Sequence, residues 1–314
     1  MTRMDGKIAE KGIPQAVLLE KLSKAQRYAN ASKAFRFMND PFRYSSAMWW
    51  QYIAFPFFKS EKEFRIQTFW DSPFAVRLPA GTDIYLSGAK THPSELNLAR
   101  FLIQNLNEGQ CFWDIGSHFG YFTALAAKLC GSKGSVLSIE ASAWAFTTLT
   151  RNVAHLPGVS AIHKAISDTV GRITFYEFPA KYSEFNSIHI DQYKDESWFQ
   201  SCQPKIHKVE AETLDHLIHT ASRQPDMIKI DVEGAEDRVF KGAEQLLQSD
   251  RNLSIIMEYM PDDQHNEAIR NIQEHGWKVF TINKLGECTP LYQTAEDYLS
   301  TVKLDSDNFI LRKL

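Results

Sequence analysis

The sequence predicts an α/β fold built on a mostly parallel, seven-stranded sheet with helices on both faces. From Gly109 onward, short apolar segments alternate with longer amphipathic segments, which is the pattern of a parallel sheet covered by helices. Two of the apolar segments, within Phe112–Thr123 (FWDIGSHFGYFT) and Met227–Glu236 (MIKIDVEGAE), end in an acidic residue and then turn through glycine into a helix. Such turns line a ligand crevice at the carboxyl ends of parallel strands.

The order of the expected elements follows from this alternation. Strands are expected near 111–115, 135–140, 159–166, 226–231, 253–258, 277–282 and 307–312. Helices are expected near 95–106, 119–130, 142–156, 235–248 and 264–275. The loop between the last two strands has little helical character, so the final strand is a candidate for an antiparallel orientation. Residues 169–203 lack a clear period and form a candidate lid or substrate loop.

Residues 1–90 are expected to form an N-terminal helical and small β extension ahead of a main domain, residues 91–314. Pro14 to about Met38 carries apolar residues every three to four positions, which predicts a helix. Further along, three β-rich pieces are separated by the turn residues DSP and PAG, which predicts a small antiparallel meander. The pieces are Phe64–Trp70, Phe74–Leu78 and Thr82–Leu86.

An aromatic run, Ala47–Phe58 (AMWWQYIAFPFF), stands out within this extension. One interpretation is an interfacial membrane anchor. We favour an aromatic segment packed on the main domain, on a substrate pocket or on a second copy of the chain, because Pro56 interrupts the run and no basic helical face adjoins it. A homodimer contact through the N-terminal helix, Trp49 and Trp50 stays open.

Bulk composition excludes several classes of protein. The net charge is −3, which does not favour nucleic acid as a partner. The four cysteines lie far apart without a CxxC pair, so neither a disulfide framework nor a zinc site is expected. The first residues lack the apolar core of a secretory signal, and no run of about 20 apolar residues predicts a membrane span. These features favour a cytoplasmic protein.

The first strand turn contains Asp114, Gly116, His118 and Gly120. Its G-x-x-x-G spacing differs from the G-x-G-x-x-G of a dinucleotide-binding turn, so a tight pyrophosphate loop is not indicated. Glycines that serve packing alone are the competing interpretation. The next strand ends at Glu140, where a carboxylate can accept hydrogen bonds from both hydroxyls of a ribose. Alternatively, Glu140 is an acid whose negative charge stabilises the N-terminus of the following helix.

Four short motifs lie along the main domain. They are D-x-G-x-x-x-G (Asp114, Gly116, Gly120), the second-strand acid (Glu140), A-x-S-D-x-x-G (Ala165, Ser167, Asp168, Gly171) and I-K-x-D-V-E-G-x-E (Ile228, Lys229, Asp231, Val232, Glu233, Gly234, Glu236). Together they resemble the FkbM family of S-adenosylmethionine (SAM)-dependent methyltransferases over roughly residues 91–314. Residues 1–90 share nothing with the family that can be placed. His118 is a departure, because the family more often has asparagine there.

The resemblance implies a class I SAM-methyltransferase (Rossmann-like) fold, SAM as the cofactor, and methylation of a hydroxyl on a sugar or secondary-metabolite-like small molecule. SAM carries an amino-acid moiety and no phosphate, so strand-end carboxylates and free backbone N–H groups suit its ammonium and carboxylate. Two of the residues expected at the cofactor also have simpler explanations. Ser167 could belong to a plain turn, and Glu95 could be an acid that stabilises the first turn of its helix. The residues expected around the cofactor are Glu95, Asp114, Gly116, His118, Glu140, Ala165, Ser167 and Asp231.

Methyl transfer to a neutral hydroxyl needs a group that accepts its proton. We predict Asp231 as this base or as the carboxylate that positions the acceptor, with Lys229 paired to a nearby acid. Glu233 is expected to line the pocket or to cap the following helix. His189, in the candidate lid, is an alternative base because its pKa suits proton transfer near neutrality, although an ordinary surface histidine is the simpler interpretation. A purely structural role is the alternative for Asp231.

Two questions are left open by the residues. A divalent metal is conceivable, because Asp231, Glu258 and a third carboxylate would suit magnesium, but we do not favour a metal. The leading function is an O-methyltransferase with a small-molecule or glycan acceptor. The competing classes are a nicotinamide-dependent oxidoreductase and a non-catalytic SAM-fold scaffold that binds a partner through its aromatic N-terminal segment.

Overall fold

The computed structural model describes residues 14–260, 262–291 and 304–313. Within them, the main sheet has eight strands in the order β12-β11-β13-β10-β9-β3-β4-β5. The strands β3, β4, β5, β9 and β10 run parallel, and β13 inserts antiparallel between β10 and β11. Their bounds are β3 Cys111–Ile115, β4 Ser135–Glu140, β5 Val159–His163, β9 Met227–Ile230, β10 Ser254–Glu258, β11 Trp277–Ile282, β12 Cys288–Pro290 and β13 Asn308–Lys313. This confirms a class I SAM-methyltransferase sheet with its antiparallel last strand.

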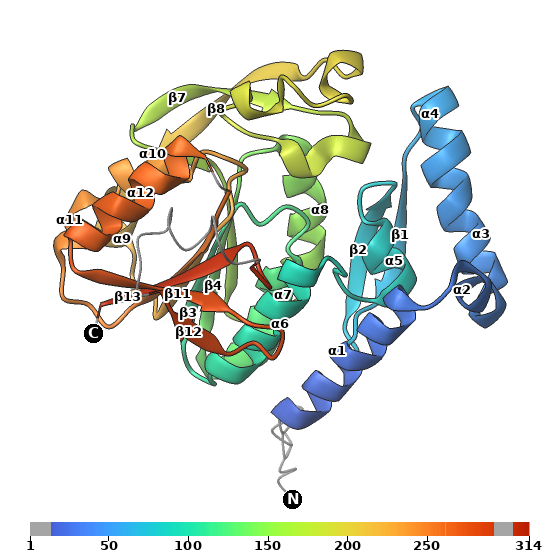
Figure 1. Ribbon diagram of the computed structural model, residues 1–314, viewed down its shortest axis with the longest axis horizontal. Coiled ribbons are helices and arrows are strands. Elements are labelled where there is room, and N and C mark those ends of the chain that lie inside the picture. Colours follow the sequence, from blue (N-terminus) through green and yellow to red (C-terminus); the bar gives the residue numbers. More distant parts are fainter. Residues whose placement is uncertain (1–13, 261, 292–303, 314) are drawn as a thin grey trace, which may run out of the picture.

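Helices cover both faces of this sheet (Figure 1). On one face, α6 and α7 pack with Phe112, Val136 and Ile256 of the strands in one hydrophobic cluster. On the other face, α9 to α12 pack with Trp113, Ile228 and a second set of strand residues. Side chains alternate along each strand, so neighbouring residues such as Phe112 and Trp113 serve opposite cores. The bounds are α6 Pro93–Asn105, α7 Tyr121–Cys130, α8 Ala143–Val153, α9 Leu214–Thr220, α10 Glu236–Lys241, α11 Glu244–Gln248 and α12 Asp263–Glu274, with a 3₁₀ turn η2 at Gly131–Lys133.

Two features of the sheet differ from the prediction. The expected strand near 159–166 divides at Lys164, because β6 (Ala165–Ile166) leaves the main sheet and pairs with β8 in a second sheet, ordered β6-β8-β7. The eighth main strand, β12, forms a hairpin with β11. A three-residue strand that ends in proline has no readable period, so the sequence contained no signal for β12. The second sheet is completed by β7 (Gly171–Glu177) and β8 (Lys205–Glu212).

The N-terminal extension is helical, and it differs from the expected layout in two places. The predicted helix from Pro14 divides because Ser32 starts a new helix by accepting a hydrogen bond from the backbone of Phe35. The third piece of the predicted meander is a helix, which ends at Gly88 with a positive φ; the meander is therefore a two-stranded hairpin. The elements are α1 Gln15–Asn30, α2 Lys33–Asn39, α3 Pro41–Trp49, a π-helical turn η1 Trp50–Ala54, α4 Phe55–Phe58, β1 Lys62–Gln67, β2 Pro73–Leu78 and α5 Thr82–Ser87.

The extension shares a hydrophobic core with the main domain. Leu18 and Leu22 of α1 belong to the same cluster as Phe101 of α6. The side chain of Asn152, on α8, accepts a hydrogen bond from the backbone N–H of Ala75 and donates to the carbonyls of Ala75 and Phe119. These contacts fix β2 beside the first strand turn. In the described part of the chain, no helix combines the length and the apolar character that crossing a bilayer requires.

The candidate lid lies over the carboxyl end of the sheet, at the top of Figure 1. It connects β7 to β8 through three short 3₁₀ turns, η3 Ala180–Phe185, η4 Asp191–Tyr193 and η5 Phe199–Ser201. Phe178, Tyr193 and Cys202 form its own small hydrophobic cluster. The lid is therefore a packed unit and not an extended loop.

Candidate active site

A cavity opens at the carboxyl ends of β3, β4 and β9. These strands flank the point where chain order reverses in the sheet, β4-β3 on one side and β9-β10 on the other, which is where open α/β sheets bind ligands. The space between its walls, including the open mouth, is about 910 Å³. Among the residues that line it are Gly116, His118, Glu140, Ala165, Phe175, Asn186, Lys229 and Asp231.

The glycine turn after β3 forms the floor of this cavity. Gly116 has a φ of 77°, and a Cβ placed there would lie 1.7 Å from the carbonyl oxygen of Asp231. The backbone N–H groups of Gly116 and Ser117 both donate to the carbonyl of Ile139. The turn is thereby pressed between the ends of β4 and β9, and only glycine fits at position 116.

Glu140 lies at the end of β4 on the cavity wall, with 7% of its surface exposed. One carboxylate oxygen accepts the backbone N–H of His118 and the other accepts that of Ser142, both at 2.7 Å. A carboxylate has about four acceptor positions, so each oxygen keeps one for a ligand hydroxyl. Burial outweighs these two hydrogen bonds and raises the pKa of Glu140 to about 7.

Lys229 and Asp231 form an ion pair in the wall of the cavity, with Lys229 buried and Asp231 partly exposed. The Lys229 ammonium lies 2.7 Å from Asp231 Oδ2 and 3.6 Å from Asp114 Oδ1. Burial alone would raise the pKa of Asp231, but Lys229 and Lys90 together hold it below the ordinary value. Asp231 is therefore ionised at neutral pH. Asp114 is 1% exposed and accepts a hydrogen bond from Thr123 at 2.6 Å, so it orients Lys229 from within the core.

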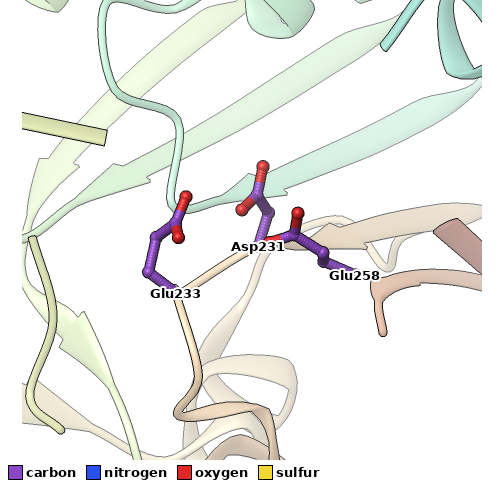
Figure 2. A group of neighbouring side chains, drawn as sticks. All are labelled: Asp231, Glu233 and Glu258. Carbon is purple, nitrogen blue, oxygen red and sulfur yellow. The ribbon is translucent and has the colours of Figure 1, made fainter. Parts of the chain in front are cut away.

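Two further carboxyl groups, those of Glu233 and Glu258, approach Asp231 (Figure 2). Oxygen atoms of the three residues lie within 4.8 Å of one another. Burial and the charge of Asp231 raise the pKa values of Glu233 and Glu258 well above the ordinary value. Glu233 also has a φ of 56°, a backbone conformation that is costly for a residue with a Cβ. The pKa of Asp231 is thus lowered, whereas the pKa values of its two neighbours are raised.

A second, open groove meets the cavity at this cluster. Helices of the N-terminal extension, the lid and the end of β10 line the groove. It shares a small set of residues with the cavity, namely Lys90, Phe122, Glu184, Asp231 and Glu233. Asp231 therefore stands between an enclosed cavity and an open groove. Such a junction suits a reaction between a cofactor held on one side and a substrate that enters from the other.

Lys90 is the principal cation at this junction. It forms an ion pair with Glu95, and the charges of Glu95, Glu184 and Asp231 outweigh its burial and raise its pKa well above the ordinary value. Together with Lys229 it faces a larger number of carboxyl groups. The members of this set that are ionised, such as Asp231, suit a ligand that carries positive charge.

The lid is tied to the strand turn that carries Asp231. Gln192 donates to the carbonyl of Glu233 at 2.8 Å, and the Tyr193 hydroxyl lies 3.3 Å from Glu233 Oε2. On the other side of the cavity, Nε2 of His118 lies 3.1 Å from the hydroxyl of Ser183. Burial lowers the pKa of His118 to about 3, so this ring is neutral. These contacts hold the lid over the cavity.

Comparison with known proteins identifies the family. Residues 114–279 match the model of the "Methyltransferase FkbM domain". The chain belongs to the FkbM methyltransferase family. The match extends over more than half of the chain and confirms the resemblance stated above, which makes SAM the cofactor. It also argues against the oxidoreductase alternative.

A curated relative and several solved structures are also similar. Hexuronic acid methyltransferase AglP from Haloferax volcanii is 26% identical over 157 residues, which cover 49% of this chain and 59% of AglP. The O-methyltransferase from Bacillus cereus in complex with SAH is 16% identical, with a TM-score of 0.38 and coverage of 71% and 81% of the two chains. Fibrillarin from Aeropyrum pernix with bound SAM is 10% identical, with a TM-score of 0.37 and coverage of 69% and 74%. At these TM-scores the solved structures add nothing to the assignment of function.

The residues predicted from the sequence occupy different places in the structure. The cavity is lined by Gly116, His118, Glu140, Ala165, Lys229, Asp231 and Glu233. Asp114 and Ser167 are buried outside that lining, Glu95 faces the groove, and His189 lines neither space. The geometry therefore favours Asp231 over His189 as the base. Their roles toward SAM stay predictions.

Sequence reasoning missed several residues that shape the site. Lys90 and Glu184 line both spaces, and Gln192 and Tyr193 hold the turn at Glu233. All four lie outside the four motifs, in the extension or the lid. The sequence signals that could have drawn attention to this part of the chain were the aromatic lid itself and its position between two core strands.

Replacing Glu140 with alanine should weaken SAM binding by about 10- to 100-fold, because ribose hydroxyls would lose a charged hydrogen-bond acceptor. The variant Glu140→Gln keeps one carbonyl acceptor, so it should lose less SAM affinity than Glu140→Ala. Titration calorimetry with SAM measures both, with the exposed Glu108→Ala as a matched control. Unchanged affinity in Glu140→Ala would remove this residue from the cofactor site.

The raised pKa of Glu140 also predicts a pH dependence. Below about pH 7 the carboxyl group holds a proton, and above it the group is ionised and accepts only. SAM affinity should therefore rise between pH 6 and pH 8 by about tenfold, and Glu140→Gln should abolish the rise. A wild-type affinity that falls over this range would contradict the assignment.

Asp231, Glu233 and Glu258 offer the oxygen ligands that magnesium prefers, and the structure thus supplies the third carboxylate that the sequence left unnamed. The Lys229 ammonium already compensates Asp231, and the raised pKa values of Glu233 and Glu258 reduce the negative charge of the cluster, so it needs no cation. We expect turnover after exhaustive treatment with EDTA to stay within about twofold of the untreated value. Loss of turnover that Mg²⁺ restores would establish a metal site here.

Proposed function

We propose that this protein is a SAM-dependent O-methyltransferase that methylates a hydroxyl of a sugar bearing a carboxylate. The observation that carries the proposal is the position of Asp231, which lines both the cavity at the switch point and the open groove. SAM bound in the cavity would direct its methyl group toward the groove. The positive charge of the sulfonium and ammonium groups suits the ionised carboxylate of Asp231 at the junction.

The reaction is an in-line displacement. With SAM held in the cavity, the acceptor oxygen would attack the methyl carbon from about 3 Å, and the electron pair of the carbon–sulfur bond would stay on sulfur to give S-adenosylhomocysteine. Asp231, kept ionised by Lys229 and Lys90, accepts the hydroxyl proton. The raised pKa values of Glu233 and Glu258 favour their protonated forms, which would donate hydrogen bonds to the acceptor and leave Asp231 as the base.

The chemistry of the groove supports a carboxylate-bearing sugar. Lys33, Arg36 and Lys181 line it together with Tyr28 and Tyr44. Arg36 lies over the Tyr44 ring at 5.8 Å, and its Nε is buried without a hydrogen-bond partner among the described residues. Guanidinium groups bind carboxylates, and aromatic rings pack on sugar rings. The similarity to hexuronic acid methyltransferase AglP points to the same acceptor chemistry.

Transfer of labelled methyl from SAM to glucuronate- and glucose-containing glycosides tests this proposal. We expect the uronate to be the better acceptor, and Arg36→Gln to raise its KM by about 10-fold or more while the KM of the neutral sugar changes little. Arg27→Gln, an exposed arginine on α1 outside the groove, is the matched control. Equal use of both sugars, or an equal effect of both substitutions, would rule out carboxylate recognition by Arg36.

A further inference from the structure

The extension carries an exposed apolar surface that none of the site chemistry uses. We call it the aromatic face. Phe42 is 88% exposed, Met38 80%, Phe57 75% and Phe58 71%. An exposed cluster of this kind marks an interaction site in a folded protein. The aromatic face consists of Phe35, Phe37, Met38, Phe42, Trp49, Tyr52, Ile53, Phe57 and Phe58.

The aromatic face follows one side of a continuous helical segment. Exposed positions recur at Phe42, Trp49, Ile53 and Phe57, with the spacing of a single helix face. The opposite side is packed, with Ala47, Ala54 and Phe55 buried. At 1.5 Å per residue, positions 42 to 57 extend about 22 Å. This segment lies at the outer edge of the molecule, away from the main sheet (Figure 1). The aromatic run was expected to pack on the main domain, on a substrate pocket or on a second copy of the chain; within the described residues, its exposed half does not pack on the main domain.

The charge of this segment differs from that of the whole chain. Residues 31–60 contain four basic residues and one acid, and ten of these 30 residues are aromatic, against 12% in the whole chain. The chain as a whole has a net charge of −3. Lys59, at the end of this segment, and Lys62, just beyond it, lie over the Phe55 and Phe64 rings and form no ion pair with a described carboxylate. Both lysines are exposed, so their ammonium groups can bind an anionic surface.

From these observations we infer that the aromatic face docks the enzyme on an anionic lipid bilayer surface. Tryptophan and phenylalanine favour the boundary between head groups and acyl chains, and adjacent lysines bind anionic head groups. The segment lies along the surface of the bilayer. Apart from Ser45, its outward side carries only apolar and aromatic side chains, so docking buries no unpaired charge.

Docking would also orient the groove. Tyr52 belongs to the aromatic face and lines the groove, and Arg36 and Tyr44 line the groove from the same helices. A bilayer against the aromatic face would therefore lie next to the entrance for the acceptor. This consequence rests on the proposed function, whereas the docking itself does not.

Co-sedimentation of the full-length protein with vesicles tests the inference. We expect binding to vesicles of phosphatidylcholine with 30% phosphatidylglycerol, and about tenfold weaker binding to phosphatidylcholine alone. The triple variant Phe42→Ser, Trp49→Ser and Phe57→Ser should lower binding by about tenfold or more. Lys59→Glu with Lys62→Glu should weaken binding to the anionic vesicles alone.

A matched control removes three exposed apolar side chains elsewhere, through Val170→Ser, Ile206→Ser and Leu285→Ser. This control should bind vesicles as the wild type does, and both triple variants should keep wild-type SAM affinity, which separates docking from the proposed function. Equal loss in both triple variants, or no wild-type binding, would overturn the inference. So would a wild-type dimer in solution that only the aromatic-face variant converts to monomer, because the face would then be an interface between two copies.

Discussion

Asp231→Asn should lower kcat by about 10²- to 10⁴-fold while SAM affinity changes by less than about threefold. The amide cannot accept the proton of the acceptor hydroxyl, whereas it keeps the shape of the carboxylate. Lys229 keeps a carboxylate partner, because Asp114 lies 3.6 Å from its ammonium, so the fold should survive the change. Labelled methyl transfer measures turnover, and calorimetric titration measures SAM affinity.

The matched control for this variant is Asp237→Asn, on α10, which lines neither the cavity nor the groove. It makes the same chemical change close by in the chain and should leave turnover near the wild-type value. A base also shapes the pH profile, so the residual turnover of Asp231→Asn should rise with pH as more acceptor loses its proton without help. Full activity in Asp231→Asn would exclude this residue as the base.

Gly116→Ala should abolish SAM binding and lower the free energy of unfolding by about 2–5 kcal/mol, the combined cost of a left-handed alanine and an overpacked contact. The added Cβ would lie 1.7 Å from the carbonyl oxygen of Asp231. Because that carbonyl belongs to the end of β9, relief of the clash must separate the two strands that form the cavity. Chemical denaturation and SAM titration measure the two effects.

The control variant Gly109→Ala separates the cost of a left-handed backbone conformation from the cost of a steric clash at the added Cβ. Gly109 has a φ of 88°, and a Cβ there would meet nothing within 4 Å. This variant should lose only about 1–2 kcal/mol, the cost of the left-handed conformation, and should bind SAM normally. If both variants lost the same stability and both bound SAM, the close approach of Gly116 to β9 would have no role in shaping the cavity.

The main sheet could be predicted because each of its buried strands is a short apolar run in the sequence. The strands β3, β4 and β11 occupy the expected residues, since each is a short apolar run bounded by turn residues. The acids at the ends of β4 and β9 could also be placed, because parallel strands end at one edge of the sheet. The local pattern of apolar residues and the parallel topology together were sufficient to predict that Glu140 and Asp231 lie at the cavity.

The remaining features depend on contacts between distant parts of the chain. Nothing near Ala165 indicates that it leaves the main sheet, because its new partner, β8, lies about 45 residues further along. Lys90 reads as an ordinary surface lysine until Glu95, Glu184 and Asp231 surround it. The aromatic run was predicted to be packed, because a sequence records which residues are apolar and not which of them the fold leaves uncovered.

Calorimetric titration of the purified protein with SAM and, separately, with NAD⁺ tests the central claim most directly. The FkbM assignment and the cavity at the β3–β9 switch point predict micromolar SAM binding, weakened in Glu140→Ala, and no response to NAD⁺. Absence of SAM binding by the folded wild-type protein, or SAM binding that neither Glu140→Ala nor Gly116→Ala affects, would contradict the placement of the cofactor in this cavity.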